Sequence, residues 1–475
     1  MNIAENIETI GMKERMVESR RISDKKTLFF GIKLKRPGKL RRKDFGVLIG
    51  AQILMFAAIY ALNNFQPYFE ELHSKRMETF GGRFLIIFLL SLLVFQILFL
   101  FYIAWLFVKY KAVKSVSDEL LPSCTVIVPA YNEGELVYHT LKSITDSNFP
   151  KDKIEVIAID DGSKDDTWEW IKKAKLELGD SLTILQQPEN RGKRHALYRG
   201  FKAGKGEILI TIDSDSVVEK DTIRNLVSPF AVDENCGAVA GNVKVLNNNQ
   251  GMIPKMLNVS FVFSFEFIRA AQSSLGFVLC TPGALSAYKR EAVFNCLDNW
   301  INQKFLGNFA TIGEDRAMTN FILKQGYDVK FQRNAKVLTN TPTAFRNLHK
   351  MFTRWGRSNV RETLMMKSFI FKNFRDKHKA GARFIFLNQC VRLLVAIPLM
   401  VMMLYFLFSH PLLYVCSALT GTFIFSSIQV LFFTKQYNFV DALWAYPYSV
   451  FYMFALFWII PFAIVSVKNG GWLTR

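Results

Sequence analysis

The sequence between residues 124 and 213 contains three short β-rich runs: CTVIVPA (124–130), EVIAID (155–160) and EILITID (207–213). A fourth run, LTILQQ, covers residues 182–187, and helical patterns follow Asn132 and Ser163 and return near Lys193. Strands that alternate with helices at this spacing are typical of a mostly parallel α/β sheet. We therefore predict an α/β domain over residues 115–343, which is long enough to bury a core of its own.

Acidic residues stand at the ends of two of these predicted strands. EVIAID leads into Asp160-Asp161-Gly162-Ser163, and EILITID ends in Asp213, two residues before Asp215. Ligands of open α/β sheets bind at the carboxyl ends of the strands. An Asp-x-Asp at such an end can hold a divalent ion that bridges a substrate diphosphate. Because the sequence has no P-loop and no Rossmann glycine motif, a nucleotide diphosphate held through a metal is the better interpretation.

Each of these features also has a purely structural interpretation. Ser163 with Asp166, and Asn132 with Glu135, could be helix capping boxes. The Asp-Asp-Gly step could be only a turn, and a single Asp-x-Asp is weak evidence for a metal site. The combination at successive strand ends favours a functional site.

The regions on both sides of this domain are apolar and basic. The chain has 475 residues, 50% of them hydrophobic, and a formal net charge of +20, which suits neither a disordered protein nor an ordinary soluble enzyme. Residues 45–62 and 84–108 lack acidic and basic side chains, and three more apolar blocks cover 384–408, 412–433 and 442–467. Stretches of this length can cross a bilayer as helices.

We predict four further regions from this pattern: a basic cytoplasmic tail (1–44), a transmembrane hairpin (45–114), amphipathic interface helices (344–383) and a C-terminal transmembrane region (384–475). The excess of Lys and Arg beside the first spans predicts a cytoplasmic catalytic domain. The amphipathic segment could instead be a helix packed on the α/β domain. Pro447 and Pro461 leave the number of crossings after residue 434 open, and Arg392 lies within one apolar block.

Several other classes of protein are disfavoured. The six cysteines form no C-x-x-C pair and the histidines show no metal-type spacing, which argues against a disulfide scaffold and a zinc site. The basic residues cluster beside apolar spans rather than on a separate surface, which argues against nucleic-acid binding. A transporter without catalysis would explain the spans but not the strand-end carboxylates.

Five motifs together resemble family 2 glycosyltransferases with a GT-A fold: VIVPAYNE (126–133), DDGS (160–163), NRGKRHAL (190–197), DSD (213–215) and GEDRAMTN (313–320). The membrane segments and the Arg354-Trp355 pair resemble the processive branch of that family, which includes hyaluronan, chitin, cellulose and poly-N-acetylglucosamine synthases. The likeness to hyaluronan synthases rests on GEDRAMTN and three further stretches: FEFIRAAQS (265–273), CTPGALSAYKRE (280–291) and GWLTR (471–475).

The resemblance implies a role for individual residues. Those expected around the uridine and its phosphates are Pro129, Ala130, Tyr131, Glu133, Asp161 and Lys193. Asp213 and Asp215 would bind Mg²⁺ or Mn²⁺ on the diphosphate. Asp315 would be the general base that takes the acceptor hydroxyl proton, with Glu314 and Arg316 ordering it.

The remaining implied residues concern the acceptor sugar and closure of the site. Cys280 would lie in the loop under the acceptor. Trp355 would stack on the acceptor while Arg354 faces the phosphates, although Met351 stands where the related Q-x-x-R-W motif has Gln. Trp472 and Arg475 would belong to a gating element that closes over the nucleotide.

The function implied is that of an inverting, processive glycosyltransferase of the plasma membrane. It would polymerise UDP-sugars, UDP-GlcNAc and UDP-GlcA if it is hyaluronan synthase-like, into a β-linked polysaccharide and extrude the growing chain across the bilayer. A chitin- or poly-N-acetylglucosamine-type synthase that uses UDP-GlcNAc alone, or a lipid-linked sugar transferase, is the alternative. The sequence leaves the oligomeric state open.

Overall fold

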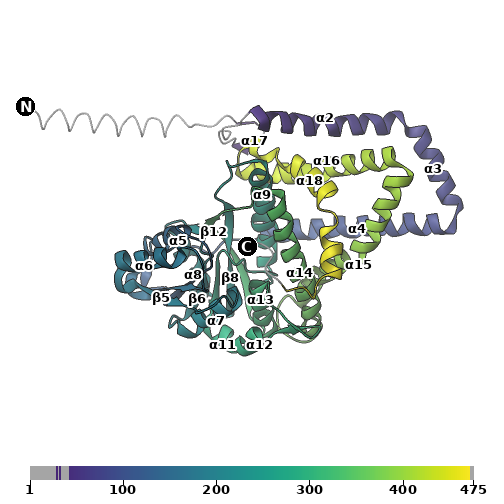
Figure 1. Ribbon diagram of the computed structural model, residues 1–475. Coiled ribbons are helices and arrows are strands. Elements are labelled where there is room, and N and C mark those ends of the chain that lie inside the picture. Colours follow the sequence, from purple (N-terminus) through teal and green to yellow (C-terminus); the bar gives the residue numbers. More distant parts are fainter. Residues whose placement is uncertain (1–27, 30–31, 34–41, 471–475) are drawn as a thin grey trace, which may run out of the picture.

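The computed structural model describes residues 28–29, 32–33 and 42–470, so most of the predicted basic tail lies outside the described residues. An α/β domain stands beside a bundle of long helices (Figure 1). The domain is built on one eight-stranded sheet with this spatial order: β5 (Leu182–Gln186), β4 (Ile154–Asp160), β3 (Cys124–Ala130), β6 (Ile208–Thr211), β9 (Ser286–Lys289), β8 (Cys236–Val245), β12 (Asp328–Thr339) and β7 (Ser216–Val218).

The strands of this sheet run mostly in one direction. Strands β3, β4, β5 and β6 are parallel to one another, and β12 is parallel to β8. Strand β9 is antiparallel to both β6 and β8, and β7 is antiparallel to β12. Strand β3 is buried along its whole length, as expected of a parallel strand covered on both faces. The predicted mostly parallel α/β sheet is confirmed.

Helices and short turns surround the sheet. The helices are α5 (Leu136–Thr145), α6 (Thr167–Leu178), α7 (Lys193–Ala203), α8 (Thr222–Val232), α11 (Arg290–Phe294), α12 (Leu297–Ile301) and α13 (Glu314–Lys324). Shorter elements are the 3₁₀ turns η1 (Asp118–Leu120), η2 (Lys151–Lys153) and η3 (Gly179–Ser181), and the two-stranded pairs β1 (Leu28–Phe29) with β2 (Ile32–Lys33) and β10 (Lys304–Phe305) with β11 (Asn308–Phe309). Helix α7 lies so close to the sheet that a Cβ on Gly200 would be 2.4 Å from Ile127 Cγ2.

The two suggested capping boxes are wrong. Among the described residues, neither the start of α5 at Leu136 nor the start of α6 at Thr167 has a side-chain cap. Asn132 and Ser163 bond to each other's loops instead, because the β3 and β4 strands end side by side. The Asn132 amide donates to Ser163 Oγ at 3.0 Å, and the Lys164 amide donates to Asn132 Oδ1 at 2.9 Å.

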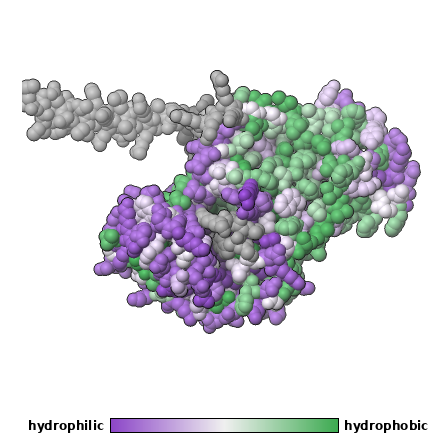
Figure 2. All heavy atoms as spheres, in the orientation of Figure 1, coloured by the Kyte–Doolittle hydropathy of each residue, from purple (hydrophilic) through white to green (hydrophobic). Residues whose placement is uncertain are grey.

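Among the described residues, four helices are long and apolar enough to cross a membrane: α2 (Arg42–Asn64), α4 (Phe80–Lys109), α15 (Lys379–Ser409) and α16 (Pro411–Gln436). Helix α3 (Gln66–Glu78) connects α2 to α4. The last apolar block forms α17 (Phe439–Ala442), α18 (Ala445–Ala455) and α19 (Ile459–Val465). The chain bends by 44° between Phe439–Ala455 and Ile459–Val465, so this block could make a broken span or a re-entrant loop. Figure 2 shows apolar side chains over this bundle and polar ones over the α/β domain.

Helix α14 (Phe345–Ile370) occupies the amphipathic segment. It packs against α13 and α19, and it buries polar residues such as Arg361 and Glu362 as well as Leu348 and Met351. Helix α14 thus lies between α13 of the α/β domain and α19 of the last apolar block, and its place at a membrane interface stays a prediction. A continuous helical segment, α9 (Met252–Val262), the π-helix η4 (Phe263–Arg269) and α10 (Ala270–Ser273), joins the sheet to the bundle.

Candidate active site

A pocket of about 790 Å³ opens at the carboxyl ends of β4 and β5. It is lined by Tyr131, residues 162–164 and residues 186–190. Gly162 has φ +70°, and a Cβ there would lie 2.5 Å from the carbonyl carbon of Glu189, so the two loops can approach each other only at a glycine. The site has the size of a small-molecule pocket and lies where an α/β sheet binds ligands.

Asp161 lies beneath this pocket and holds one of its loops. Its carboxylate accepts hydrogen bonds from the amides of Arg191 at 3.0 Å and Gly192 at 2.9 Å, and from the side chain of Gln187. Burial raises the pKa of Asp161, and these hydrogen bonds oppose the rise only in part. Asp161 therefore anchors the segment that carries Lys193, and a direct contact with the nucleotide stays a prediction.

The other residues expected around the uridine lie on the same edge. Pro129 and Ala130 end strand β3, and the Ala130 carbonyl accepts the Asp161 amide at 2.8 Å. Tyr131 lines the pocket. The Glu133 amide donates to Thr167 Oγ1 at 2.8 Å, which holds the loop after β3 against the start of α6.

Lys193 begins α7 and lies among carboxylates. Its Nζ forms an ion pair with Asp213 and lies 3.4 Å from Glu314 Oε1. Burial disfavours the charge on Lys193, but Asp213 and Glu314 outweigh it and raise its pKa above the ordinary value. Burial alone would raise the pKa of Glu314. The positive charge of Lys193 outweighs burial, so the pKa of Glu314 lies below its ordinary value.

Asp315 occupies the first turn of α13, next to Glu314. Its Oδ2 accepts from the Gly283 amide at 3.1 Å and lies 3.8 Å from Cys280 Sγ, and its Oδ1 accepts from the Arg316 amide at 2.7 Å. Burial, with the negative charge of Glu314, raises the pKa of Asp315. Two adjacent carboxyl groups thus have pKa values pushed in opposite directions, as in known acid–base pairs, and the role of Asp315 as the base stays a prediction.

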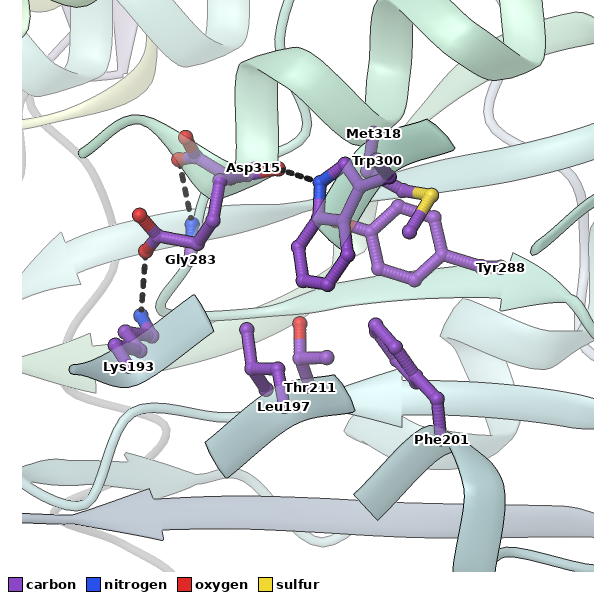
Figure 3. Close-up of a pocket in the computed structure, with 10 residues that line it drawn as sticks. Lys193, Leu197, Phe201, Thr211, Gly283, Tyr288, Trp300, Asp315 and Met318 are labelled. Carbon is purple, nitrogen blue, oxygen red and sulfur yellow. Dashed lines mark hydrogen bonds and ion pairs between the residues drawn. The ribbon is translucent and has the colours of Figure 1, made fainter. Parts of the chain in front are cut away.

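Lys193, Gly283 and Asp315 face one another from three separate elements (Figure 3). A cavity of about 10 Å³ lies beside them, with Thr211, Tyr288 and Trp300 among its lining residues. Such a volume is roughly that of one water molecule. Burial raises the pKa of the neighbouring Cys280 thiol to about 12, so that only a small fraction of it is thiolate at neutral pH.

Asp213 and Asp215 flank the turn between β6 and β7, and Asp215 Oδ1 accepts from Thr339 Oγ1 at 3.3 Å. In the described part of the chain, no three His, Cys, Asp or Glu side chains are grouped as a metal site. Mg²⁺ and Mn²⁺ prefer oxygen donors, and Mg²⁺ typically takes one or two carboxylates with substrate phosphates and water. The two carboxylates therefore fit such an ion and do not fit a tetrahedral zinc site.

The Arg354-Trp355 pair lies in the first half of α14, and Arg354 is near Glu314. The charge of Arg354 helps to lower the pKa of Glu314. Trp355 is 43% exposed, with its ring 5.7 Å from that of Phe352 and 6.1 Å from that of Phe261. Met351 is buried in the core, so an apolar contact replaces the polar one of the related motif.

Trp472 and Arg475 lie outside the described residues. Gly470, the last described residue before them, lies near the site. Its carbonyl accepts a hydrogen bond from Thr311 Oγ1, four residues before Asp315. Arg357 Nε also donates to Ser466 Oγ at 3.0 Å. The segment before the predicted gating element is thus held against the loop that precedes Asp315.

A buried polar network behind the site was missed in the sequence. Glu362 is fully buried and accepts from Arg361 Nε at 2.8 Å, Gln303 Nε2 at 3.0 Å and Asn320 Nδ2 at 2.9 Å. Arg194 Nη1 donates to Gln303 Oε1 at 3.1 Å, which ties α7 to the same network. Glu362 is the only acidic residue of α14. A single carboxylate in an otherwise basic helix was the feature of the sequence that could have indicated a buried ion pair.

The comparisons with known proteins concern the α/β domain. Residues 125–294 match the model of the glycosyl transferase family 2. The chain therefore contains a family 2 glycosyltransferase domain, and the predictions of that domain and of its GT-A fold are confirmed.

Two curated relatives and one solved structure illustrate the likeness. The chain is 31% identical to an N-acetylglucosaminyltransferase of Rhizobium meliloti (strain 1021) over 54% of its own length and 59% of the relative's. It is 30% identical to a hyaluronan synthase of Streptococcus pyogenes over 52% of its length and 59% of the relative's. The chain thus spans less than two thirds of these relatives. A mannosyltransferase of Pyrobaculum calidifontis, solved with GDP-Man and Mn²⁺, is 18% identical with a TM-score of 0.49 over 89% of this chain and 97% of that one.

Proposed function

We propose that the protein is a membrane-embedded, inverting glycosyltransferase that polymerises sugars from UDP-sugar donors into a β-linked polysaccharide. One observation carries this proposal. Asp315, whose pKa is raised, lies beside the Lys193–Asp213 ion pair and on the same edge of the sheet as a pocket large enough for a nucleotide.

The donor would lie along this edge. Its nucleoside would occupy the pocket beside Tyr131 and the 186–190 loop, and Lys193 would meet the phosphates. A divalent cation held by Asp213 and Asp215 would neutralise the negative charge that develops on the departing diphosphate. The charge of Arg354 would contribute to the same end, because a guanidinium binds phosphate through two parallel hydrogen bonds.

Asp315 would supply the base. A sugar hydroxyl is a poor nucleophile at neutral pH, so its proton must pass to a carboxylate as it attacks. The hydroxyl oxygen forms the new bond to the anomeric carbon, the bond from that carbon to the diphosphate breaks, and the proton moves to Asp315. A single displacement inverts the configuration, so that an α-linked donor gives a β-linked product.

The acceptor would approach from the side of Trp355. This indole is part exposed and offers a flat apolar face of the kind that packs on a sugar ring. The helix that carries it, α14, also packs on α13, whose first turn holds Asp315. A sugar stacked on Trp355 would therefore be held relative to the base by one rigid contact between two helices.

Hyaluronan synthesis from UDP-GlcNAc and UDP-GlcA is the favoured form of this activity. The likeness to an N-acetylglucosaminyltransferase and to a hyaluronan synthase supports it, and the helices that could cross a membrane support export through the bundle. Lys109 ends α4, and Lys111 and Lys114 follow it, which favours a catalytic domain on the cytoplasmic side of the plasma membrane.

The product formed by the purified full-length protein in lipid nanodiscs tests the proposal. UDP-GlcNAc is supplied with and without UDP-GlcA, and any polymer is digested with hyaluronidase or chitinase. A hyaluronidase-sensitive polymer that requires both donors supports the favoured form. A chitinase-sensitive polymer from UDP-GlcNAc alone identifies the alternative synthase, a sugar linked to lipid identifies a lipid-linked transferase, and no glycosidic product from either donor contradicts the proposal.

A further inference from the structure

A buried cluster of polar side chains lies where the helix bundle meets the α/β domain. Glu266, in the π-helix η4, is 2% exposed. Its Oε1 accepts from the Tyr437 hydroxyl at 2.5 Å and from Asn242 Nδ2 at 3.0 Å, and it forms an ion pair with Lys244. Lys244 also bonds to the Tyr437 hydroxyl. Tyr437 directly follows α16, whereas Asn242 and Lys244 belong to β8, so one carboxylate oxygen joins the bundle to the sheet.

Such a cluster is not explained by stability alone. A buried ion pair gains little over apolar packing because both charges lose their hydration. Such a pair can instead fix one arrangement of the parts that it joins, and here the parts are the end of a long apolar helix and a strand of the α/β domain.

The other end of the π-helix leads to the candidate base. Arg269, its last residue, donates from Nε to the Cys280 carbonyl at 3.2 Å and from Nη1 to Ser264 Oγ at 2.9 Å. Cys280 begins the loop whose Gly283 amide donates to Asp315, and Cys280 Sγ itself lies 3.8 Å from the same carboxylate oxygen. The turn of a π-helix is wider than that of an α-helix and is frequent at functional sites.

The π-helix carries both Glu266 and Arg269. Through it, the contacts of Glu266 with Tyr437 are linked to those of Arg269 with the loop that holds Asp315. We propose that Glu266 is a positioning residue which, through Tyr437, couples the end of α16 to the orientation of the base. The proposal rests on the proposed function in that Asp315 is taken as the base. On this proposal, a displacement at the end of α16 alters the hold of the 280–283 loop on the Asp315 carboxylate.

Tyr437→Phe tests this coupling with the smallest change. It removes one hydroxyl and keeps the ring, which packs 4.7 Å from the ring of Phe433. Tyr448→Phe is the matched control. Tyr448 is also a bundle tyrosine, and its hydroxyl accepts a 3.0 Å hydrogen bond from Ser260 of α9, but it does not contact the π-helix cluster. Glu266→Gln is a second test variant, because the amide can keep one hydrogen bond while the charge that faces Lys244 is lost.

Two readouts are measured on full-length protein in nanodiscs. The first is the alkylation rate of Cys280 by N-ethylmaleimide, followed on its own peptide by mass spectrometry, which does not depend on activity. The second is the separate determination of kcat and of the donor KM.

We expect Tyr437→Phe and Glu266→Gln to raise the Cys280 alkylation rate severalfold. We expect kcat to fall by up to roughly tenfold, the equivalent of losing one hydrogen bond, with the donor KM within about twofold because the nucleotide pocket lies elsewhere. Tyr448→Phe should change neither quantity. Equal alkylation rates in the Tyr437→Phe, Tyr448→Phe and wild-type proteins would overturn the coupling. If the wild type makes no glycosidic product while the alkylation rates differ, the proposed function fails and the coupling stands.

Discussion

The backbone amide of Gly283 donates a 3.1 Å hydrogen bond to the Asp315 carboxylate. Through this contact a loop that follows the π-helix holds the first turn of α13, although the two residues are 32 positions apart in the chain. On its other side, Gly283 lies against the Lys193–Asp213 ion pair. The glycine thus separates the proposed base from the proposed phosphate site.

Gly283→Ala should weaken donor binding more than it destabilises the fold. A Cβ at this position would lie 2.7 Å from Lys193 Nζ, and the lysine, being flexible, would move away from Asp213. A shift of about 1 kcal/mol corresponds to a roughly fivefold rise in the donor KM. Gly421→Ala is the control, because nothing lies within 4 Å of its Cβ. An unchanged KM in the Gly283 variant would show that Lys193 does not hold the donor.

The pH dependence of turnover should reveal the raised pKa of Asp315. A base works only when it is ionised, so kcat should fall as the pH drops through a pKa above the usual value of about 4 for an aspartate. The negative charge of Glu314 contributes to that rise. Glu314→Gln should therefore move the acid limb of the kcat profile to lower pH. If the acid limb of the kcat profile stays in place or moves to higher pH in Glu314→Gln, Asp315 is not the base whose ionisation sets that limb.

Glu362 should matter for stability although it is remote from the sugar. Its removal leaves Arg361 and the Asn320 amide buried without their carboxylate, and a broken buried ion pair costs about 3 kcal/mol or more. Glu362→Ala should lower the midpoint of thermal unfolding in detergent markedly. Glu71→Ala, which breaks the exposed pair with Lys75, should leave it unchanged, and equal shifts in the two variants would contradict the prediction.

Removal of divalent cations should stop the reaction. Chelation by EDTA should abolish turnover, and Mg²⁺ or Mn²⁺ should restore it, because the diphosphate needs a counter-charge as it leaves. Asp213→Asn and Asp215→Asn should each raise the metal concentration that gives half of the maximal rate. Full activity in EDTA would rule out a metal at these carboxylates.

The sheet and its aspartates were predictable because their signals are local. A run such as EVIAID is apolar with turn residues at its end, and the carboxyl ends of parallel strands share one edge of the sheet, so the order of the runs already predicted that Asp161 and Asp213 would lie on that edge. The same reasoning did not predict that Asp161 is used to anchor the 187–192 loop. A carboxylate at a strand end can bind a ligand or a backbone amide, and the two uses have the same sequence pattern.

The contacts behind the site were not predictable for a different reason. Glu266 and Tyr437 are 171 residues apart, and neither carries a periodic or motif signal for the other. Helix α14 shows a related limit. Its apolar stripe fits a lipid surface and a protein surface equally well, so the stripe alone did not predict that α14 contacts both α13 and α19.

The role of Asp315 as the base is tested most directly by comparing UDP-sugar binding with turnover in Asp315→Asn. The amide keeps the size of the side chain and cannot accept the proton. We predict that the variant binds UDP-sugar within a fewfold of the wild-type affinity while kcat falls by about 10² to 10⁴. Turnover within tenfold of the wild type would contradict the account.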